Sequence, residues 1–278
     1  MNAPTLLIGL GGVGCQIVEL VSNMVTDEQR DNIAIAAFDT DVNELRVIKA
    51  RNPHIYTIQT STQQTVGEYL SHDSYACDTW FPVNNILNGK ALSEGAGQVR
   101  SISRLAFETA MQAGKLEPLH EAIQSLFKVE EDKLDQSVRV IIVSTLAGGT
   151  GSGLILPVGL YVRQYLETRF HKSSNITRGF FILPEVLFEV IKGPAERNNI
   201  KANAYATLRE LDAFLMKGDK TLARKYRDTV KMNFPRETGS GYEEYNVRPY
   251  DYCFLFDAQN ADGGKLNSFE QYKEHAAN

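Results

Sequence analysis

Short apolar runs alternate along the chain with longer segments in which apolar residues recur at helical spacing. The short runs are typical of buried strands, and the longer segments are typical of helices that cover them. This alternation predicts an α/β fold with a Rossmann-like parallel sheet flanked by helices on both faces. The expected strands are residues 5–8, 33–38, 55–58, 138–143, 177–183 and 252–256, and the expected helices include 101–113, 116–127, 154–170 and 202–215.

Two stretches, residues 60–91 and 217–250, do not follow this alternation. We interpret both as elaborations of a single domain that spans residues 1–278. Residues 217–236 are also rich in lysine and arginine. Such a run is usually a solvated helical face, and the alternative is a contact surface for a partner protein, a filament neighbour or an acidic membrane.

The strand expected at 138–143 is joined to the helix expected at 154–170 by a glycine-rich turn, LAGGTGSG, at residues 146–153. Without side chains in the way, successive backbone N–H groups can converge on one point, and the helix N-terminus adds partial positive charge there. Thr150 and Ser152 add hydroxyl donors. Because the turn lacks the Gly-Lys-Ser/Thr ending of the common P-loop, it predicts a phosphate site that works without a lysine of its own.

A second glycine cluster, GLGGVG at residues 9–14, follows the strand expected at 5–8 and precedes a helical pattern. This motif alone has several explanations. It opens dinucleotide-binding domains, it opens the adenylating domains of ubiquitin-activating-type enzymes, and it occurs where a helix packs tightly on a strand. Two glycine turns in one chain, each between a strand and a helix, favour a nucleotide site. One turn would contact the diphosphate and the other the terminal phosphates.

Two acids, Asp39 and Asp41, follow the strand expected at 33–38. Ligands of open α/β sheets gather at the carboxyl ends of the strands, so both acids are expected near the nucleotide crevice. Aspartate is also favoured at helix N-caps, which is the alternative interpretation of this pair.

Composition narrows the class of protein. The chain has 278 residues, of which 43% are hydrophobic and 23% are charged, enough for a full-sized core. The net charge of −5 argues against nucleic-acid binding. The three cysteines are widely separated, which indicates neither a disulfide framework nor a zinc site. Because the sequence shows no membrane-length apolar run and no signal-peptide pattern, we expect a cytoplasmic protein.

The order of these pieces resembles the nucleotide-binding half of the tubulin/FtsZ superfamily, and the divergent bacterial tubulin-like proteins in particular. The resemblance covers nearly the whole chain, and the two glycine turns are its specific motifs. It implies a fold of the tubulin/FtsZ GTPase-domain type and GTP or GDP with Mg²⁺ as ligands. It also implies self-association, head to tail, into a filament or oligomer.

The resemblance implies roles for residues that match the family's loops. Asp39 and Asp41 match the acidic second loop, with Asp41 near the γ-phosphate and its magnesium, bound directly or through water. Gln16 follows the first loop and would reach ribose and base. Ala147 stands where the family usually has a glycine, and its methyl is tolerable only at a negative φ. The matched phosphate-loop residues are Gly11, Gly12, Val13, Gly14 and Cys15 of the first loop, Gly95, Ala96, Gly97 and Gln98 of the third, and Gly148, Gly149, Thr150, Gly151 and Ser152 of the fourth.

Four further residues fall near the family's ribose-binding and base-binding positions, although no spacing ties them there. Glu196 lies where the fifth loop has its ribose-binding acid, and Asn260 lies near the guanine-reading sixth loop. Phe269 or Tyr272, in the helix expected from about residue 268, would stack on the base. The alternatives are a solvated acid at a helix start for Glu196 and core packing for the two aromatic residues.

Three functions follow as hypotheses. The first is a GTP-binding protein that hydrolyses GTP across its subunit interface, with backbone N–H groups and magnesium balancing the phosphate charge. The others are an adenylating or dinucleotide-dependent enzyme and a nucleotide-dependent interaction module that does not hydrolyse. In the family, the water-positioning residue follows the central helix of the next subunit. The chain ends about ten residues into that helix, so we expect a fragment with little or no hydrolysis of its own.

Overall fold

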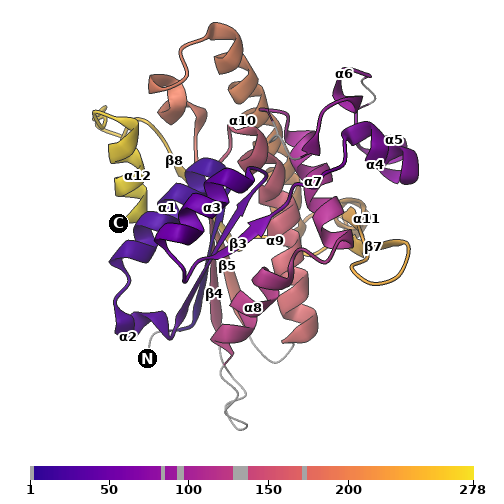
Figure 1. Cartoon of the computed structure of the whole chain (residues 1–278), viewed down its shortest axis with the longest axis horizontal. Coiled ribbons are helices and arrows are strands. Elements are labelled where there is room, and N and C mark those ends of the chain that lie inside the picture. Colours follow the sequence, from indigo (N-terminus) through magenta and orange to yellow (C-terminus); the bar gives the residue numbers. More distant parts are fainter. Residues whose placement is uncertain (1–2, 83–84, 93–96, 128–136, 171–173) are drawn as a thin grey trace.

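The computed structural model describes residues 3–82, 85–92, 97–127, 137–170 and 174–278. Within these residues, the centre is a six-stranded parallel sheet in the order β3-β2-β1-β4-β5-β8 (Figure 1). The expected Rossmann-like parallel sheet is therefore confirmed. The strands are β1 (Thr5–Leu10), β2 (Ile33–Asp39), β3 (Tyr56–Gln59), β4 (Val138–Thr145), β5 (Asn175–Ile182) and β8 (Tyr252–Phe256).

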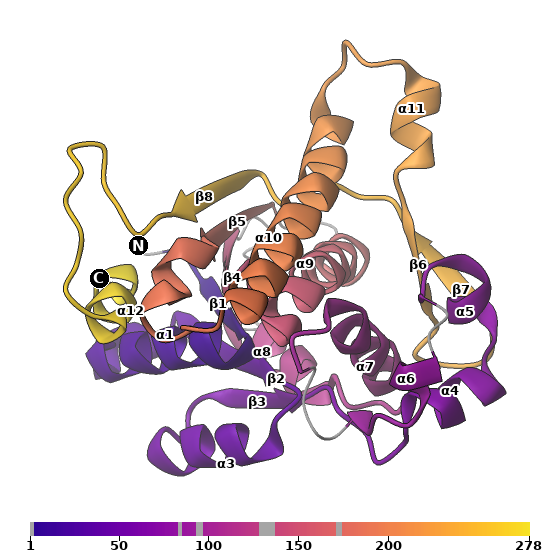
Figure 2. The ribbon, with the colours of Figure 1, turned by 90° about the horizontal axis from the view of Figure 1, so that it is seen from above.

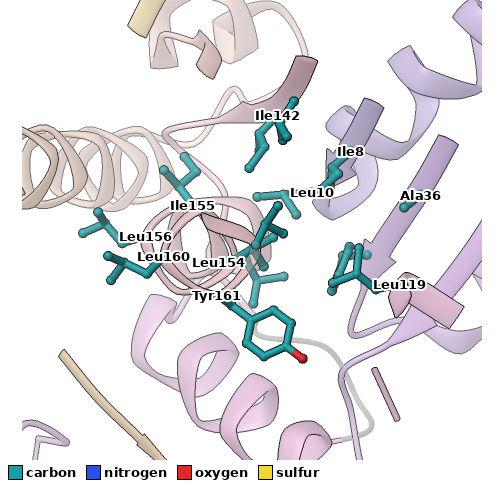
Figure 3. Close-up of a cluster of buried hydrophobic side chains, with 14 of the residues drawn as sticks. Ile8, Leu10, Ala36, Leu119, Ile142, Leu154, Ile155, Leu156, Leu160 and Tyr161 are labelled. Carbon is teal, nitrogen blue, oxygen red and sulfur yellow. The ribbon is translucent and has the colours of Figure 1, made fainter. Parts of the chain in front are cut away.

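Helices cover both faces of the sheet because the side chains of each strand alternate between the faces. Leu6 of β1 packs in one core with α7, α8, α9 and α10, whereas Leu7 packs in a second core with α1, α3 and α12. In Figure 3, Leu10 of β1 and Ile142 of β4 lie in the first core with side chains of α9. These helices are α1 (Gly11–Met24), α3 (Val42–Arg51), α7 (Arg100–Gln112), α8 (Glu117–Leu126), α9 (Gly149–Arg169), α10 (Pro194–Leu215) and α12 (Phe269–Ala277).

The position of α9 follows from its composition. From Leu154 to Val162 the helix is buried on all sides. A helix of this kind needs neighbours on its outer side as well as on its sheet side. α7 and α10 supply the outer cover.

The two irregular stretches add short elements to this core. Residues 60–91 contain α4 (Val66–His72), α5 (Tyr75–Thr79) and α6 (Asn85–Asn88), and a small core joins this stretch to α7. Residues 217–250 contain α11 (Arg224–Thr229) and the hairpin of β6 (Met232–Pro235) and β7 (Tyr242–Tyr245). The remaining short elements are α2 (Asp27–Arg30), η2 (Pro184–Glu189) and η3 (Met216–Gly218).

Some of the basic side chains of residues 217–236 form contacts within the molecule. The Lys217 ammonium donates to the carbonyl oxygens of Arg227 and Val230 at 2.6 and 2.5 Å. Lys231 forms an ion pair of 2.5 Å with Glu244 across the hairpin. The partner surface expected on this stretch stays a prediction.

No helix within the described ranges has the length and apolar composition needed to cross a lipid bilayer.

Candidate functional site

The two glycine turns lie side by side at the point where the strand order reverses. β1 and β4 are neighbours in the sheet, and they lead into α1 and α9 on its opposite faces. Open α/β sheets bind ligands at this kind of position. A Cβ atom on Gly11 would lie 2.8 Å from the nitrogen of Gly151, and Gly11 has a φ of +70°. Glycine therefore allows both the backbone conformation and the contact between the turns.

The helices that start at these turns are not capped by their own side chains. Leu10 stands at the N-cap of α1 and Gly148 at the N-cap of α9, and in the described structure neither makes a side-chain cap hydrogen bond. Neither first turn contains an acidic residue. By contrast, Asp41 caps α3. Glu117 lies in the first turn of α8, and Glu196 lies in the first turn of α10. First-turn N–H groups need acceptors, so two bare helix starts that lie side by side suit an anion.

The hydroxyl groups of the second turn have different partners. Thr150 is half-buried, and its Oγ1 lies 3.0 Å from Oγ1 of Thr40, which follows β2. Ser152 is buried and donates to the carbonyl oxygen of Gly148. Thr150 thus links the turn to the end of β2, whereas the Ser152 hydroxyl is used inside the helix.

Asp39 and Asp41 occupy different environments at the end of β2. Asp39 is 4% exposed, and its Oδ1 accepts hydrogen bonds from the Asp41 N–H at 3.0 Å and the Thr40 hydroxyl at 3.4 Å. Burial is the main cause that raises the pKa of Asp39 to about 6. Asp41 is the N-cap of α3, where its Oδ1 accepts from the Asn43 N–H at 2.8 Å. One oxygen of Asp41 is therefore committed to the helix.

A third acid, Glu44, lies beside the first turn. A Cβ atom on Gly12 would lie 2.8 Å from its Oε2. Burial, followed by the charge of Asp41, raises the pKa of Glu44. Among the described residues, no group of three or more His, Cys, Asp or Glu side chains is arranged to hold a metal ion. Mg²⁺ is usually held by one or two carboxylates together with waters and phosphates, so these acids fit Mg²⁺ only alongside a phosphate ligand.

The third loop rests on the second glycine turn. Gly97 and Gln98 have φ angles of +50° and +63°. A Cβ atom on Gly149 would lie 2.7 Å from both the nitrogen and the Cα of Gln98. The loop backbone therefore leaves room only for glycine at position 149. Gly95 and Ala96 lie outside the described residues.

Asn203 on α10 holds these two segments together, although no sequence motif includes it. Its Nδ2 donates to the carbonyl oxygens of Gln98 at 2.9 Å and Ala147 at 3.1 Å. The residue is only 9% exposed. It stands in the buried stripe of α10 with Ile200 and Leu211. A polar residue in an apolar helix stripe is the signal that could have revealed it.

Ala147 joins the two turns to α12. It is fully buried with Leu187 of η2, and Val13 of the first turn and Phe269 of α12 pack against the same cluster. Gln98 is the only non-glycine residue with a positive φ in the described part of the chain. Ala147 therefore meets the condition for a methyl group at this position.

The helix α12 runs beside α1 (Figure 2). Residues of both helices line a groove. Its volume is about 630 Å³, and Gln16, Phe269 and Lys273 are among the residues that line it. The Lys273 ammonium donates to Oε1 of Gln16 at 2.8 Å and pairs with Glu270 at 2.6 Å. It also lies 5.2 Å from the centre of the Phe269 ring. The fold thus brings Gln16 and Phe269 together, with Lys273 as an additional contact that the motifs do not indicate.

Tyr272 and Asn260 organise the loop between β8 and α12. Tyr272 is 4% exposed, and its hydroxyl donates to the carbonyl oxygen of Ala258 at 2.7 Å and accepts from the Leu266 N–H at 3.2 Å. Oδ1 of Asn260 accepts from the Gly264 N–H at 2.7 Å. Both side chains are therefore engaged with the loop itself.

Glu196 and Cys15 complete the predicted set. Glu196 is exposed in the first turn of α10, where the helix dipole favours a carboxylate. Cys15 is fully buried beneath the first glycine turn, and its Sγ lies 3.3 Å from the carbonyl oxygen of Phe38. Burial raises the pKa of this thiol well above its usual value. The Cys15 side chain is therefore a neutral packing group in this structure.

Comparisons with known proteins identify the family and the fold of the chain. No curated protein sequence matches the chain. The chain is similar in structure to CetZ2 from Haloferax volcanii in a GTPγS-bound protofilament, with 15% identity and a TM-score of 0.51, covering 99% of this chain and 56% of that one. It is also similar to TubZ from Bacillus thuringiensis serovar israelensis in a GTPγS-form protofilament, with 12% identity and a TM-score of 0.51, covering 99% of this chain and 54% of that one.

The chain thus spans about half the length of these two proteins. The two structures establish the shared fold. A family model described as tubulin-like matches residues 6–278, which confirms the resemblance drawn from the glycine turns. The chain belongs to the tubulin-like family, as a divergent relative of tubulin and FtsZ.

Proposed function

We propose that this chain binds GTP or GDP at its two glycine turns, where the starts of α1 and α9 lie side by side. The observation that carries the proposal is the pair of bare helix starts, at Gly11 and Gly149, that meet where the strand order reverses. Phosphate oxygens would accept hydrogen bonds from the first-turn N–H groups of both helices. They would also lie in the positive field of both helix N-termini.

The surrounding residues divide by the part of the nucleotide that they would contact. The backbone of residues 11–14 and 148–150 binds phosphates, and Gln98 closes over the terminal phosphate. Asp41 would hold Mg²⁺, directly or through water. The bound ion would supply positive charge to the phosphate oxygens. Gln16 and Phe269 line the groove beside α12, and we expect ribose and base to lie there.

The choice of guanine rests on the structural relatives. CetZ2 and TubZ, which share this fold, form protofilaments with GTPγS. We therefore expect guanosine phosphates in preference to ATP or NAD. A dinucleotide-dependent or adenylating enzyme would hold NAD or ATP at the first glycine turn instead.

The test is to identify the nucleotide that the protein carries. Purified protein is denatured, and the released compounds are separated by chromatography. A preparation that releases no nucleotide is titrated by calorimetry with GTPγS, GDP, ATP and NAD. Guanosine phosphates are expected to be released or to bind most tightly. Preferential recovery or binding of ATP or NAD would contradict the proposal.

We further propose that the full-length protein associates with itself head to tail and hydrolyses GTP across the subunit interface. The protofilaments of both structural relatives support self-association. A site shared between subunits predicts that the GTPase rate rises more steeply than linearly with protein concentration. A rate strictly proportional to concentration would show a self-sufficient site. Filaments that bind GTP without turnover would favour the non-hydrolysing interaction module.

A further inference from the structure

The groove beside α12 contains a buried lysine that is paired on two sides. Lys273 is 7% exposed and belongs to the groove lining. Its ammonium donates to Oε1 of Gln16 on α1 at 2.8 Å and forms an ion pair with Oε1 of Glu270 at 2.6 Å. Lysine is almost never buried to this extent unless it has such partners. The two contacts therefore hold the ammonium at a defined place between α1 and α12.

The contact with Lys273 determines which way the amide of Gln16 faces. An ammonium group only donates hydrogen bonds, whereas an amide has one end that accepts and one end that donates. Oε1 must therefore face Lys273, and Nε2 must point the other way. Gln16 is half-buried, and in the described structure its Nε2 donates to no protein acceptor and keeps accessible surface. The donor end of this amide is consequently the end that is available to a ligand.

The other polar side chains of the groove are paired or exposed. Oε1 of Glu19 accepts from Nδ2 of Asn52 at 3.2 Å and lies 3.9 Å from Nη1 of Arg51. Asn23 and Arg51 offer further donors, but both side chains are exposed, so water can satisfy them. Gln16 differs from these residues because the fold holds its amide in one orientation, with the donor end left over.

We propose that Lys273 is a positioning residue, which fixes the Gln16 amide so that Nε2 donates to the carbonyl oxygen at C6 of a guanine base. This inference rests on the proposed nucleotide site, and it names what selects the base there. Guanine carries a carbonyl oxygen at C6, which accepts a hydrogen bond. Adenine carries an amino group at the same position, which donates, so two donors would face each other in the groove.

The amide cannot be reversed to suit adenine without a second cost. A reversed amide would offer Oε1 to the adenine amino group, but it would direct the Nε2 hydrogens at the Lys273 ammonium. That ammonium would then lose its acceptor on α1. Since a buried polar group without a partner is unfavourable, adenine binds less well with either orientation of the amide. Lys273 thereby makes Gln16 a donor that discriminates against adenine.

The test compares four nucleoside diphosphates by calorimetry. GDP and IDP carry the carbonyl oxygen at C6, whereas ADP and 2-aminopurine riboside diphosphate lack it. We expect GDP and IDP to bind with similar affinity, and the other two at least about fivefold more weakly. Tight binding of GDP and the 2-aminopurine nucleotide but not of IDP would show that the amino group at C2 is recognised instead, which overturns the inference. No binding of either GDP or IDP would overturn the proposed function together with it.

Lys273→Met removes the ammonium but fills most of its volume. Because the Gln16 amide is then free to turn, ADP should bind more tightly and GDP a few-fold more weakly, so that the preference for GDP over ADP falls by about fivefold. Lys273→Arg keeps N–H donors for Oε1 of Gln16 and should keep the preference. Lys225→Met, at an exposed position of α11, is the matched control and should bind like the wild type. Circular dichroism checks the fold of each variant.

Gln16→Met shows whether Lys273 acts through Gln16. This variant removes the amide, so it should lose most of the preference for GDP over ADP. When Lys273→Met is added to it, the ratio of the two affinities should not change further, because the two residues act as one unit. Either single methionine variant keeping the preference, or a further loss in the double variant, would overturn the inference and leave the proposal of GTP binding intact.

Discussion

The two ends of the proposed nucleotide site are built differently. At the glycine-turn end, backbone packs on backbone, as where Gly149 lies against Gln98. At the α12 end, side chains make the contacts, as between Gln16 and Lys273. A backbone contact leaves no space for any side chain, whereas one side chain can often be replaced by another of similar size. We therefore expect substitutions to have large effects at the glycine-turn end and small effects at the α12 end.

Gly149→Val is expected to have the largest effect. The valine side chain would enter the space of the Gln98 backbone and displace the third loop. Overpacking of this kind costs about 1–3 kcal/mol, which corresponds to a loss of nucleotide affinity of up to roughly a hundredfold. Calorimetry measures the affinity, and circular dichroism checks the fold. Gly148→Ala is the control, because a Cβ atom there meets only Cγ2 of Thr145, at an ordinary 3.5 Å. Equal affinities of the two variants would contradict the backbone-contact argument.

Stability should depend on pH through Asp39. Its pKa is about 6 in the fold, whereas the ordinary pKa of an aspartate is 3.8, so between these values the folded state keeps a proton that the unfolded state loses. The free energy of unfolding therefore falls as the pH rises from about 4 to about 6. Above that range the whole loss, on the order of 3 kcal/mol, is present.

Asp39→Asn removes this cost while keeping an acceptor for the Asp41 N–H. In urea denaturation of nucleotide-free protein, we expect the variant to be more stable than the wild type at neutral pH and similar at about pH 4. A variant that is less stable than the wild type at neutral pH would show that the Asp39 charge stabilises the fold.

Asn203→Ala should weaken the link between the third loop and the second turn. The carbonyl oxygens of Gln98 and Ala147 would lose their shared donor, at a cost of about 1–3 kcal/mol in the free energy of unfolding. We also expect GTP affinity to fall by roughly tenfold, and more than GDP affinity, because in the proposed site Gln98 closes over the terminal phosphate. Asn199→Ala, at an exposed position of the same helix, should change neither property. Equal losses for GTP and GDP would remove Gln98 from that role.

Asp41 can be tested separately as a helix cap and as a ligand. Asp41→Asn keeps a good N-cap but loses the charge, whereas Asp41→Ala loses both, at a cost of about 1 kcal/mol in stability. We expect both variants to weaken Mg²⁺-dependent GTP binding by a few-fold, and only the alanine variant to lower the melting temperature. Titrations with GTPγS and GDP, with and without Mg²⁺, measure the first effect. A loss that is the same without Mg²⁺ would argue against the ligand role.

The smallest effect is expected at the α12 end. Phe269→Leu keeps an apolar side chain in the groove, so nucleotide affinity should fall only a few-fold, and equally for GTP and GDP. Tyr272→Phe should leave affinity unchanged, because its ring is buried and its hydroxyl holds the loop at Ala258. If calorimetry showed a larger loss of affinity for Tyr272→Phe than for Phe269→Leu, Tyr272 would be the residue that contacts the base.

Local chemistry explains what could be predicted from the sequence. Strand and helix periods and the glycines of residues 9–14 and 146–153 can be recognised from neighbouring residues alone. They therefore predicted the parallel sheet and both turns. The same local logic restricted Asp41 to an N-cap or a ligand position, and the cap is present in the fold. Positions without such a local pattern, Glu196 and Asn260 above all, could be assigned only loosely.

The tertiary structure alone decided which distant residues meet. The order β2-β1-β4 places Thr40 against Thr150, and α10 places Asn203 on the carbonyl groups of two separate loops. Burial then raised the pKa of Asp39. It also left the Ser152 hydroxyl bonded to the carbonyl oxygen of Gly148. The residues next to a given residue in the sequence do not show which distant residues pack against it, nor whether it is shielded from water. Those are properties of the assembled sheet and its helices, because a polar group inside a protein takes its partner from whatever segment the fold brings beside it.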